Sequence, residues 1–383
     1  MSPPARLPAL AALLVALGSA AVWMLPAEIA ARCWIARRGD PLDRAMTIVE
    51  LDAHLGWRQR PGLDCRFYGQ RLRTNERGLR NPPLAEAAAA RRRVLVLGPS
   101  STFGWGVAEN ATYARRLERL LRQEPGSRGA VAVVNAGQIG YSVWQGLELY
   151  RSGELRSLRP DVVVIAYGLN DMDRYRFAFN SPEPDAAALG RGQNPVSVRL
   201  QNLLSRLQFL QLSRRHLLFW AGRLFHPASA AAWTPHGLRV PVPDFEGFLL
   251  ELVRLVRADG ARVILLTSAY RIPADSPPAD AGDLRSRINA EPWRIHKDLE
   301  ALNARVLAVA RREGLPAVDV ARLLEGTDAQ ELFVDPAHPS DQGHALIARA
   351  LLRAIQENCP STSSDSGRPG APAGPSADVA RGL

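Results

Sequence analysis

Short apolar runs alternate with amphipathic stretches between residues 94 and 356, and this alternation limits the possible folds more than any other feature of the sequence. The apolar runs are rich in Val, Ile and Leu and lie at residues 94–97, 131–134, 162–166, 262–267 and 316–320. The stretches with helical periodicity lie at about 112–124, 143–157, 244–259, 294–313 and 341–356. Continuously apolar strands separated by helices are typical of a parallel sheet that is covered on both faces. We therefore expect an α/β protein with a three-layer, doubly wound parallel sheet.

Composition argues against two classes of function. The formal net charge is +10, but Lys297 is the only lysine among 48 basic residues, and the arginines are scattered rather than clustered. We therefore expect no nucleic-acid partner. The cysteines, Cys33, Cys65 and Cys359, form no CxxC or Cys/His cluster, and nucleotide-binding and zinc-protease motifs are missing, so we expect no cofactor and no metal. Cys65 and Cys359 can pair only in an oxidising compartment and are otherwise free thiols.

The N-terminal segment Leu7–Leu25 contains no charged residue. As a helix it would extend about 28 Å, which is close to the hydrocarbon thickness of a bilayer. We interpret it as a transmembrane helix that anchors the chain in a single pass. The alternatives are a signal peptide cleaved near residues 18–20, which would leave a secreted protein, and a buried core helix. Arg32, Arg37 and Arg38 follow the segment, and the positive-inside rule alone would keep the rest of the chain in the cytoplasm.

A long segment from Asp173 to Pro243 interrupts the alternating pattern after the third apolar run. Within residues 196–225, leucines recur at three- and four-residue steps with arginines between them, which predicts an amphipathic helix or a pair of helices. We interpret this helical insertion as a cap that packs on the core. The alternative is a substrate lid or a helix that lies on a membrane surface near the anchor.

Small and polar residues follow the predicted strands at the points where the strands end. The segments read GPSSTFG at 98–104, NAGQIGYS at 135–142, GLND at 168–171 and DPAHPSDQGH at 335–344. Because the carboxyl ends of parallel strands meet at one edge of a sheet, we expect these segments to lie together. They supply serines, backbone N–H groups at glycines, an asparagine amide and an Asp/His pair. Acyl transfer needs these groups as nucleophile, oxyanion donors and oriented base.

These four segments, in this order and each after a strand, resemble the sequence blocks of the GDSL or SGNH hydrolases. The resemblance covers roughly residues 93–356 and implies an SGNH, flavodoxin-like sheet and a serine esterase. LGWRQRPG at 55–62 and TNERGLRNP at 74–82 are similar, more weakly, to the segment before the catalytic domain in membrane-anchored bacterial members. No GxSxG motif is present, which argues against an α/β-hydrolase.

The resemblance implies a domain organisation with four parts. Residues 1–31 would be the anchor or signal segment, and residues 32–92 a membrane-proximal lead-in region. Residues 93–358 would be the SGNH hydrolase domain, which contains the insertion at 173–243. Residues 359–383 are poor in apolar side chains and rich in Pro, Ser and Gly, and we expect them to form a disordered tail.

The resemblance also implies a role for each site residue. Ser100 matches the nucleophile, His338 the general base, and Asp335 the carboxylate that fixes the tautomer of the histidine. The oxyanion hole would consist of the N–H of Ser100, the N–H of Gly140 and the side chain of Asn170. Gly140 lacks a Cβ, which lets its N–H come close to a substrate.

Two assignments have alternatives, and one residue departs from the pattern of the family. Ser101 could be the nucleophile, but the spacing to the neighbouring glycines favours Ser100. Asp341 and His344 repeat the Asp-x-x-His spacing, but they match the start of the final helix, where Asp341 is expected as an N-cap or first-turn carboxylate. Pro99 stands where the family usually has Asp. Proline removes the N–H of residue 99 and leaves that of Ser100 in place.

We therefore expect a carboxylic ester hydrolase that forms an acyl-enzyme on Ser100. Its substrate would be a small-molecule, glycan or lipid ester, and its catalytic domain would lie outside the cytoplasm. An O-acyltransferase that uses the same residues, and a non-catalytic protein that kept the fold, are the alternatives. The sequence does not indicate an oligomeric state.

Overall fold

A computed structural model describes most of the chain. The described residues are 6–39, 41–125, 131–172, 183–214, 217, 238–271, 273, 275, 292–326 and 329–358. For residues 6–21, 41, 42, 292, 329 and 330 the description covers the backbone alone. The expected disordered tail at 359–383 lies outside these residues, as do parts of the insertion.

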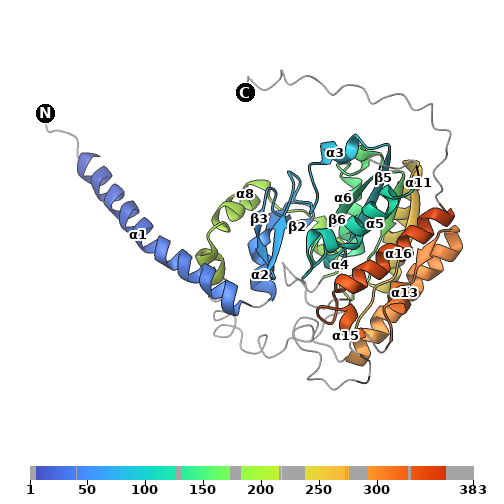
Figure 1. The fold of residues 1–383 in the computed structure, drawn as a ribbon. Coiled ribbons are helices and arrows are strands. Elements are labelled where there is room, and N and C mark those ends of the chain that lie inside the picture. Colours follow the sequence, from blue (N-terminus) through green and yellow to red (C-terminus); the bar gives the residue numbers. More distant parts are fainter. Residues whose placement is uncertain are drawn as a thin grey trace.

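The central sheet has five parallel strands, as the alternating pattern predicts (Figure 1). The strands are β5 (Arg92–Gly98), β6 (Val131–Gly137), β7 (Val162–Ile165), β8 (Arg262–Leu266) and β9 (Ala317–Val318). Their order in the sheet is β6-β5-β7-β8-β9, and the register pairs Val94 with Val133 and with Val162. This is the flavodoxin-like order, in which the direction of winding changes between β5 and β7. Ligands of such sheets bind beyond the carboxyl ends of the strands at that point.

Helices cover both faces of the sheet. One face carries α5 (Tyr113–Arg122) and α16 (Asp341–Asn358), and the other carries α6 (Val143–Arg151), α11 (Val242–Ala258) and α13 (Pro292–Glu313). Alternate residues of β5 point to the two faces, so that Val94 and Val96 pack with α5 and α16 while Leu95 and Leu97 pack on the opposite side. The sequence expectation of a three-layer α/β fold is therefore confirmed.

Helix α6 ends at Arg151, earlier than the periodicity predicts, because Gly153 follows in the left-handed conformation with φ +90°. Short helices fill the remaining connections of the sheet domain. They are α3 (Leu84–Ala88), α4 (Ser100–Phe103), η1 (Glu109–Ala111), η2 (Arg156–Leu158), α14 (Val320–Leu323) and α15 (Ala329–Leu332).

The lead-in region forms a helix and two antiparallel hairpins that pack on the sheet domain. Its elements are α2 (Pro41–Ile48), β1 (Val49–Asp52), β2 (Gly56–Gln59), β3 (Asp64–Phe67) and β4 (Gln70–Arg73). Ile48, Trp57 and Leu72 are buried in the same apolar cluster as Leu95 and Leu97 of β5. The lead-in region therefore shares a core with the sheet domain.

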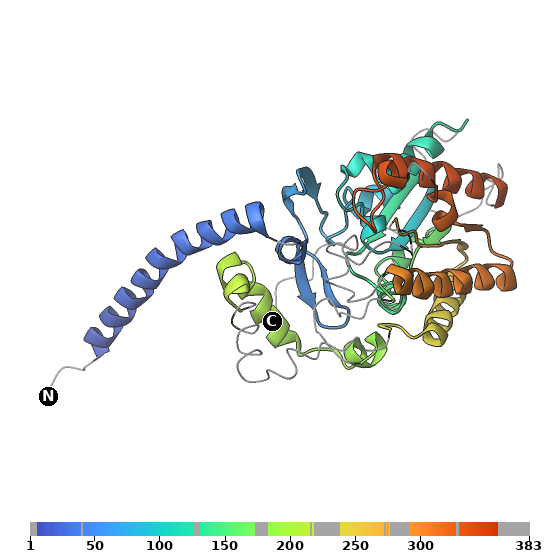
Figure 2. The same ribbon diagram turned by 90° about the horizontal axis from the view of Figure 1, so that it is seen from below.

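Helix α1 (Arg6–Arg38) projects away from the sheet domain, as Figure 2 shows from a second direction. Among the residues whose side chains are described, no helix is both long and apolar enough to be a candidate membrane span. The expected anchor at Leu7–Leu25 falls largely within residues 6–21, which have no described side chains, so the structure gives the transmembrane helix no support and the span stays a prediction.

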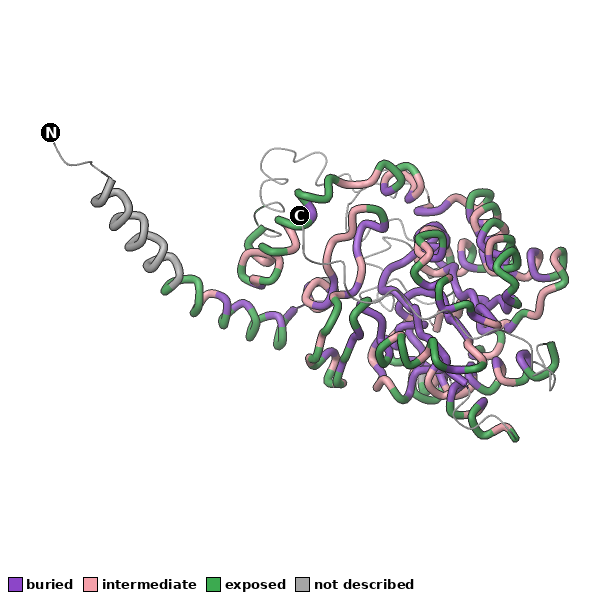
Figure 3. The backbone as a smooth tube through the Cα atoms, turned by 90° about the horizontal axis from the view of Figure 1, so that it is seen from above, coloured by how far each residue is buried: buried purple, intermediate pink, exposed green. Residues whose placement is uncertain are grey.

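The described part of the insertion contains α7 (Asp185–Gly190), α8 (Pro195–Leu204) and a further helical segment at 208–214. Helix α8 has the amphipathic pattern that the sequence predicts. Its leucines do not pack on the core, however, since Leu200, Leu203 and Leu204 are exposed. Figure 3 shows α8 largely in the colours of exposed and intermediate residues. The interpretation of this helix as an ordinary packed cap is therefore wrong for its leucine face.

Candidate active site

Ser100 stands at the carboxyl end of β5, where the chain turns from strand into the first residue of α4. Its side chain is buried, and its Oγ lies 2.7 Å from Nε2 of His338. The two residues are 238 positions apart in the chain, so the fold and not the local sequence brings them together. Ser100 and His338 have the hydrogen-bond distance that a nucleophile and its base need.

His338 is held between Ser100 and Asp335. Its Nδ1 lies 2.7 and 2.8 Å from the two carboxylate oxygens of Asp335. A carboxylate only accepts hydrogen bonds, so the ring proton belongs on Nδ1 and the lone pair of Nε2 faces the Ser100 hydroxyl. In this tautomer the imidazole can take the proton of Ser100 and keep a charge partner on its other side.

Asp335 is fixed by the turn that carries it. One of its oxygens accepts the backbone N–H groups of Ala337 and His338, both at 2.9 Å. Burial acts to raise the pKa of Asp335, but the attraction of His338 and these hydrogen bonds act more strongly and lower it to about 2. Asp335 is therefore ionised throughout the neutral range, as a partner of an imidazolium must be.

Aromatic side chains form a wall beside His338. The Trp105 ring stacks on the imidazole with centroids 5.2 Å apart and an interplanar angle of 17°. Trp105 in turn contacts Phe67 and Tyr68, whose ring centroids lie 4.9 and 5.0 Å away. Because Phe67 and Tyr68 belong to the β3–β4 hairpin, the lead-in region supplies one side of the site.

The three expected oxyanion donors follow three neighbouring strands. No described residue accepts a hydrogen bond from the N–H of Ser100 or from that of Gly140. Gly140 has φ +77°, a conformation that glycine adopts without strain. The side-chain amide of Asn170 donates to the carbonyl of Tyr141 at 3.0 Å, which leaves its second N–H for a substrate. Each of the three groups can therefore donate a further hydrogen bond, and their role as an oxyanion hole stays a prediction.

The loop after Ser100 is supported without a side-chain acceptor at position 99. Arg80 of the lead-in region is buried and donates to the carbonyls of Phe103, Gly104 and Val107 at 2.7 to 3.2 Å. The side chain of Asn135 donates to the carbonyl of Thr102 at 2.8 Å. These contacts explain physically how a loop with proline in place of the family's usual aspartate keeps its shape.

The loop with Gly140 is held by a buried ion pair that sequence reasoning missed. Arg239 donates through Nε to both carboxylate oxygens of Asp185, at 2.9 and 2.8 Å, and through Nη1 to the carbonyl of Gly140 at 2.6 Å. Its Nη2 donates a hydrogen bond to the side-chain oxygen of Gln145, and the guanidinium lies over the ring of Trp57. Both members of the pair come from the insertion. The insertion therefore fixes the carbonyl of Gly140, in the peptide that follows the N–H expected to be an oxyanion donor.

Removal of Arg239 should be costly because it leaves Asp185 buried and unpaired. The side chains are 1% and 4% exposed. Arg239→Met is expected to lower the free energy of unfolding by about 3–5 kcal/mol, measured by urea denaturation. Arg239→Met combined with Asp185→Leu should lose less than Arg239→Met alone, because no buried charge remains. Strictly additive losses in this double-mutant cycle would contradict the pairing.

His344 and Asp341 do not form a second catalytic pair. Asp341 is in the first turn of α16, as expected, and pairs with Arg116 at 2.6 Å. His344 is fully buried, and its Nδ1 accepts the N–H of Tyr113 at 3.1 Å. Burial, together with the positive charges of Arg80 and Arg116, lowers the pKa of His344 to about 3. His344 is thus a neutral packing residue.

The low pKa of His344 makes the stability depend on pH. Between pH 3 and 6.5 the unfolded chain binds a proton at this histidine and the folded protein does not, so stability falls as the pH drops through this window. We expect His344 to contribute a slope of up to about 1.4 kcal/mol per pH unit. Asp171, whose pKa burial raises to about 7, contributes a slope of opposite sign above its usual pKa.

The contribution of His344 can be isolated by comparison with His344→Gln, in which an amide oxygen can still accept from Tyr113. Urea denaturation of both proteins between about pH 4.5 and 6.5 measures the two slopes. The variant should lose less stability on acidification than the wild type. Equal slopes would show that His344 does not titrate on unfolding in this range.

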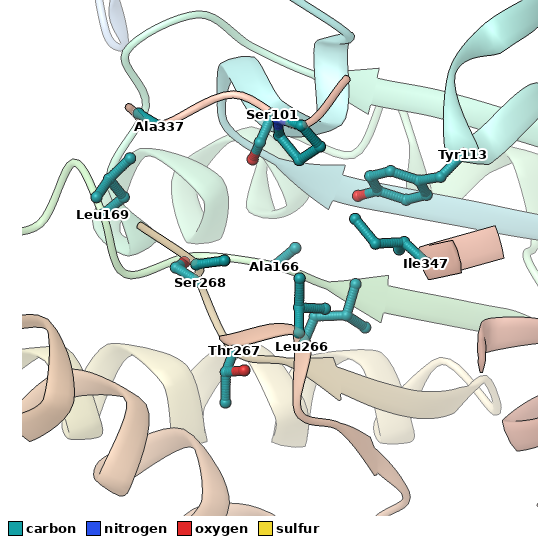
Figure 4. A pocket seen from close by; sticks show the side chains of 12 residues that line it. Ser101, Tyr113, Ala166, Leu169, Leu266, Thr267, Ser268, Ala337 and Ile347 are labelled. Atoms are coloured by element: carbon teal, nitrogen blue, oxygen red, sulfur yellow. The ribbon is translucent and has the colours of Figure 1, made fainter. Parts of the chain in front are cut away.

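A small pocket lies next to the site, on the α16 side of the sheet, and contains about 30 Å³ of free space. Figure 4 shows Ser101, Leu169, Ser268 and Ile347 around it, whereas Ser100 is not among its lining residues. The space is enough for a water molecule but not for a long acyl chain. Ser101 therefore faces a different environment from Ser100, which alone of the two bonds His338.

The geometry of these strand ends agrees with a comparison of the sequence with known families. Residues 96–346 match the model of the GDSL-like Lipase/Acylhydrolase family, which is more than half of the chain. The protein belongs to this family. It is accordingly a carboxylic ester hydrolase, as the four sequence segments indicate.

Solved structures of several GDSL-like Lipase/Acylhydrolase proteins and esterases resemble this one at low sequence identity. The lipase/acylhydrolase from Enterococcus faecalis is 19% identical with a TM-score of 0.42, and the match covers 70% of this chain and 96% of that one. A GDSL-like lipase from Bacteroides thetaiotaomicron is 16% identical with a TM-score of 0.39, and the match covers 72% and 95%. An acetylxylan esterase from Geobacillus stearothermophilus is 18% identical with a TM-score of 0.40, and the match covers 70% and 96%. No curated protein matches the chain.

Proposed function

We propose that the protein hydrolyses acyl esters through a covalent acyl-enzyme on Ser100. The observation that carries the proposal is the chain of short contacts from Ser100 Oγ to His338 and from His338 to Asp335. Oγ attacks the carbonyl carbon of the ester while Nε2 of His338 takes the hydroxyl proton. The tetrahedral intermediate then collapses, and the alcohol leaves with that proton. Water, deprotonated by His338, releases the acid in a second round of the same steps.

The negative charge of the tetrahedral intermediate would be stabilised by three donors. These are the N–H groups of Ser100 and Gly140 and the free amide N–H of Asn170. A single donor of this kind typically lowers the barrier by about 3–4 kcal/mol. Arg239 holds the Gly140 carbonyl, and thereby the backbone next to the Gly140 N–H, in the free enzyme, which limits the reorganisation of this donor during the reaction.

The substrate class that we propose is an acyl ester carried by a glycan or by a lipid. Purified protein should be assayed with acetyl and longer-chain chromogenic esters, an O-acetylated oligosaccharide and a phospholipid, with the products identified by mass spectrometry. Free acid is the expected product. An acylated sugar acceptor would instead identify an O-acyltransferase that uses the same residues, and the absence of any product would favour a non-catalytic member of the family.

We also propose a single-pass membrane protein with its catalytic domain outside the cytoplasm, on the basis of the uncharged segment Leu7–Leu25. The alternative is secretion after signal cleavage. A reporter fused after Asn358 should be active when the reporter requires export. Activity of a reporter that works only in the cytoplasm, with none outside, would contradict this orientation.

A further inference from the structure

Helix α8 is oriented with its apolar side away from the protein. Val196, Leu200, Leu203 and Leu204 lie within one third of the helix circumference and are 73%, 58%, 61% and 48% exposed. An amphipathic helix of a globular protein normally buries this side. Among the described residues, these four side chains, called here the α8 apolar face, therefore have no core to cover.

The polar side of α8 is the side that attaches it to the protein. Asn202 accepts the N–H of Leu51 at 2.8 Å and donates to the carbonyl of the same residue at 2.9 Å. Val198, on the same side, is buried. These contacts fix the rotation of the helix, so the exposure of the α8 apolar face is built into the packing.

The charged residues of the sequence segment that contains α8 are of one sign. From Ala186 to Pro243 the sequence contains seven arginines and no Asp, Glu or Lys. Arg199, Arg206 and Arg214 of this segment are exposed. The apolar face of such a helix can be buried among lipid acyl chains, and the arginines that border it are attracted to anionic headgroups. A helix of this kind is therefore complementary to an anionic lipid surface.

The segment that follows α8 contacts the C-terminal part of α1, which projects from the same side of the molecule (Figures 1 and 2). Glu28 of α1 is buried and accepts the N–H of Phe209 at 2.9 Å, and Arg32 contacts the carbonyl of Arg206. Towards its N-terminus α1 exposes Ile29 and, at the C-terminal end of the expected span Leu7–Leu25, also Val22, Trp23 and Leu25. The two helices thus place exposed apolar side chains at the same end of the molecule.

We infer that the α8 apolar face docks on a membrane and inserts its leucines at the boundary between headgroups and acyl chains, with the neighbouring arginines on anionic lipid headgroups. This contact is distinct from the expected span at Leu7–Leu25. It does not depend on the proposed reaction, because it requires only the helix and the lipid.

The experiment that tests this inference measures how deeply α8 lies in a lipid bilayer. The full chain with Cys33→Ser, Cys65→Ala and Cys359→Ser would carry Leu203→Cys labelled with an environment-sensitive fluorophore. The matched control carries the label at Glu357→Cys instead, an exposed position on α16 at the far side of the sheet domain. Both proteins are reconstituted with phosphatidylcholine vesicles that contain about a third phosphatidylglycerol and a lipid with a nitroxide near the headgroup.

We expect the nitroxide lipid to quench the label at position 203 by about half and to leave the label at position 357 unchanged. Arg199→Gln, Arg206→Gln and Arg214→Gln together should reduce the quenching at position 203. Equal emission at both positions in protein that floats with the vesicles would overturn the inference, as would failure to float. Energy transfer between labels at position 203, without quenching by lipid, would identify a second copy of the chain as the occupant and would also overturn it.

Discussion

Replacing Ser100 with alanine is expected to lower kcat for ester hydrolysis by a factor of at least about 10³, and by as much as about 10⁶ if the uncatalysed background is low. The alanine removes the only atom that can form the acyl-enzyme and leaves His338 without a proton to accept. The side chain is small and buried, so the fold should survive the change. Initial rates with a chromogenic acetyl ester, on protein with unchanged circular dichroism, measure the effect.

Ser101→Ala is the matched control, because it removes the same atom one residue later in the chain. Ser101 faces the neighbouring pocket, so this variant should keep most of the activity. A complete loss of activity in Ser101→Ala, with activity preserved in Ser100→Ala, would show that Ser101 and not Ser100 is the nucleophile.

His338→Ala is expected to lower kcat by a factor of about 10³ or more, with a much smaller change in KM. The imidazole is needed to deprotonate Ser100 and to protonate the leaving alcohol, which are steps of the transition state and not of ground-state binding. Steady-state kinetics across a range of ester concentrations separates the two parameters.

The comparison with His344→Gln distinguishes a catalytic histidine from a packing one. His344 contacts Tyr113 and lies in the core, so its substitution should act on stability and leave kcat of the folded protein nearly unchanged. Loss of turnover in folded His344→Gln, with an active His338→Ala, would reverse the roles of the two histidines.

The sequence could predict the sheet and the positions of the reactive groups because both depend on local patterns. Apolar runs define strands, and in a parallel sheet the residues after each strand meet at one edge. Ser100, Gly140 and Asn170 follow β5, β6 and β7, which are neighbours in the observed order. Their convergence therefore needs no knowledge of side-chain packing.

The residues that hold the loops of the site in place could not be predicted, because they act through contacts between distant segments of the chain. Arg239 is 99 residues from Gly140 and is marked by no motif. Arg80 is 23 residues from Phe103 and lies in the TNERGLRNP segment, but the resemblance of that segment gives Arg80 no role in the site. The buried pair of Arg239 with Asp185 has no signal in spacing or periodicity. The run without acidic residues around it would have suggested a solvated arginine instead.

Helix α8 shows a different limit of sequence reasoning. Periodicity identified its apolar side, but periodicity does not say whether that side faces the core or the outside. The direction is set by Asn202, whose two hydrogen bonds to Leu51 turn the opposite side towards the protein. Only the placement of these residues distinguishes a packed cap from an outward-facing helix.

The most direct test of the central claim is covalent labelling of the folded protein with an activated phosphonate ester, which mimics the tetrahedral intermediate. Peptide mapping by mass spectrometry should find one adduct, on Ser100. The adduct should disappear in Ser100→Ala and persist in Ser101→Ala. An adduct on Ser101, or a folded protein that takes up no phosphonate while a known serine esterase is labelled in parallel, would contradict the assignment of Ser100 as the nucleophile.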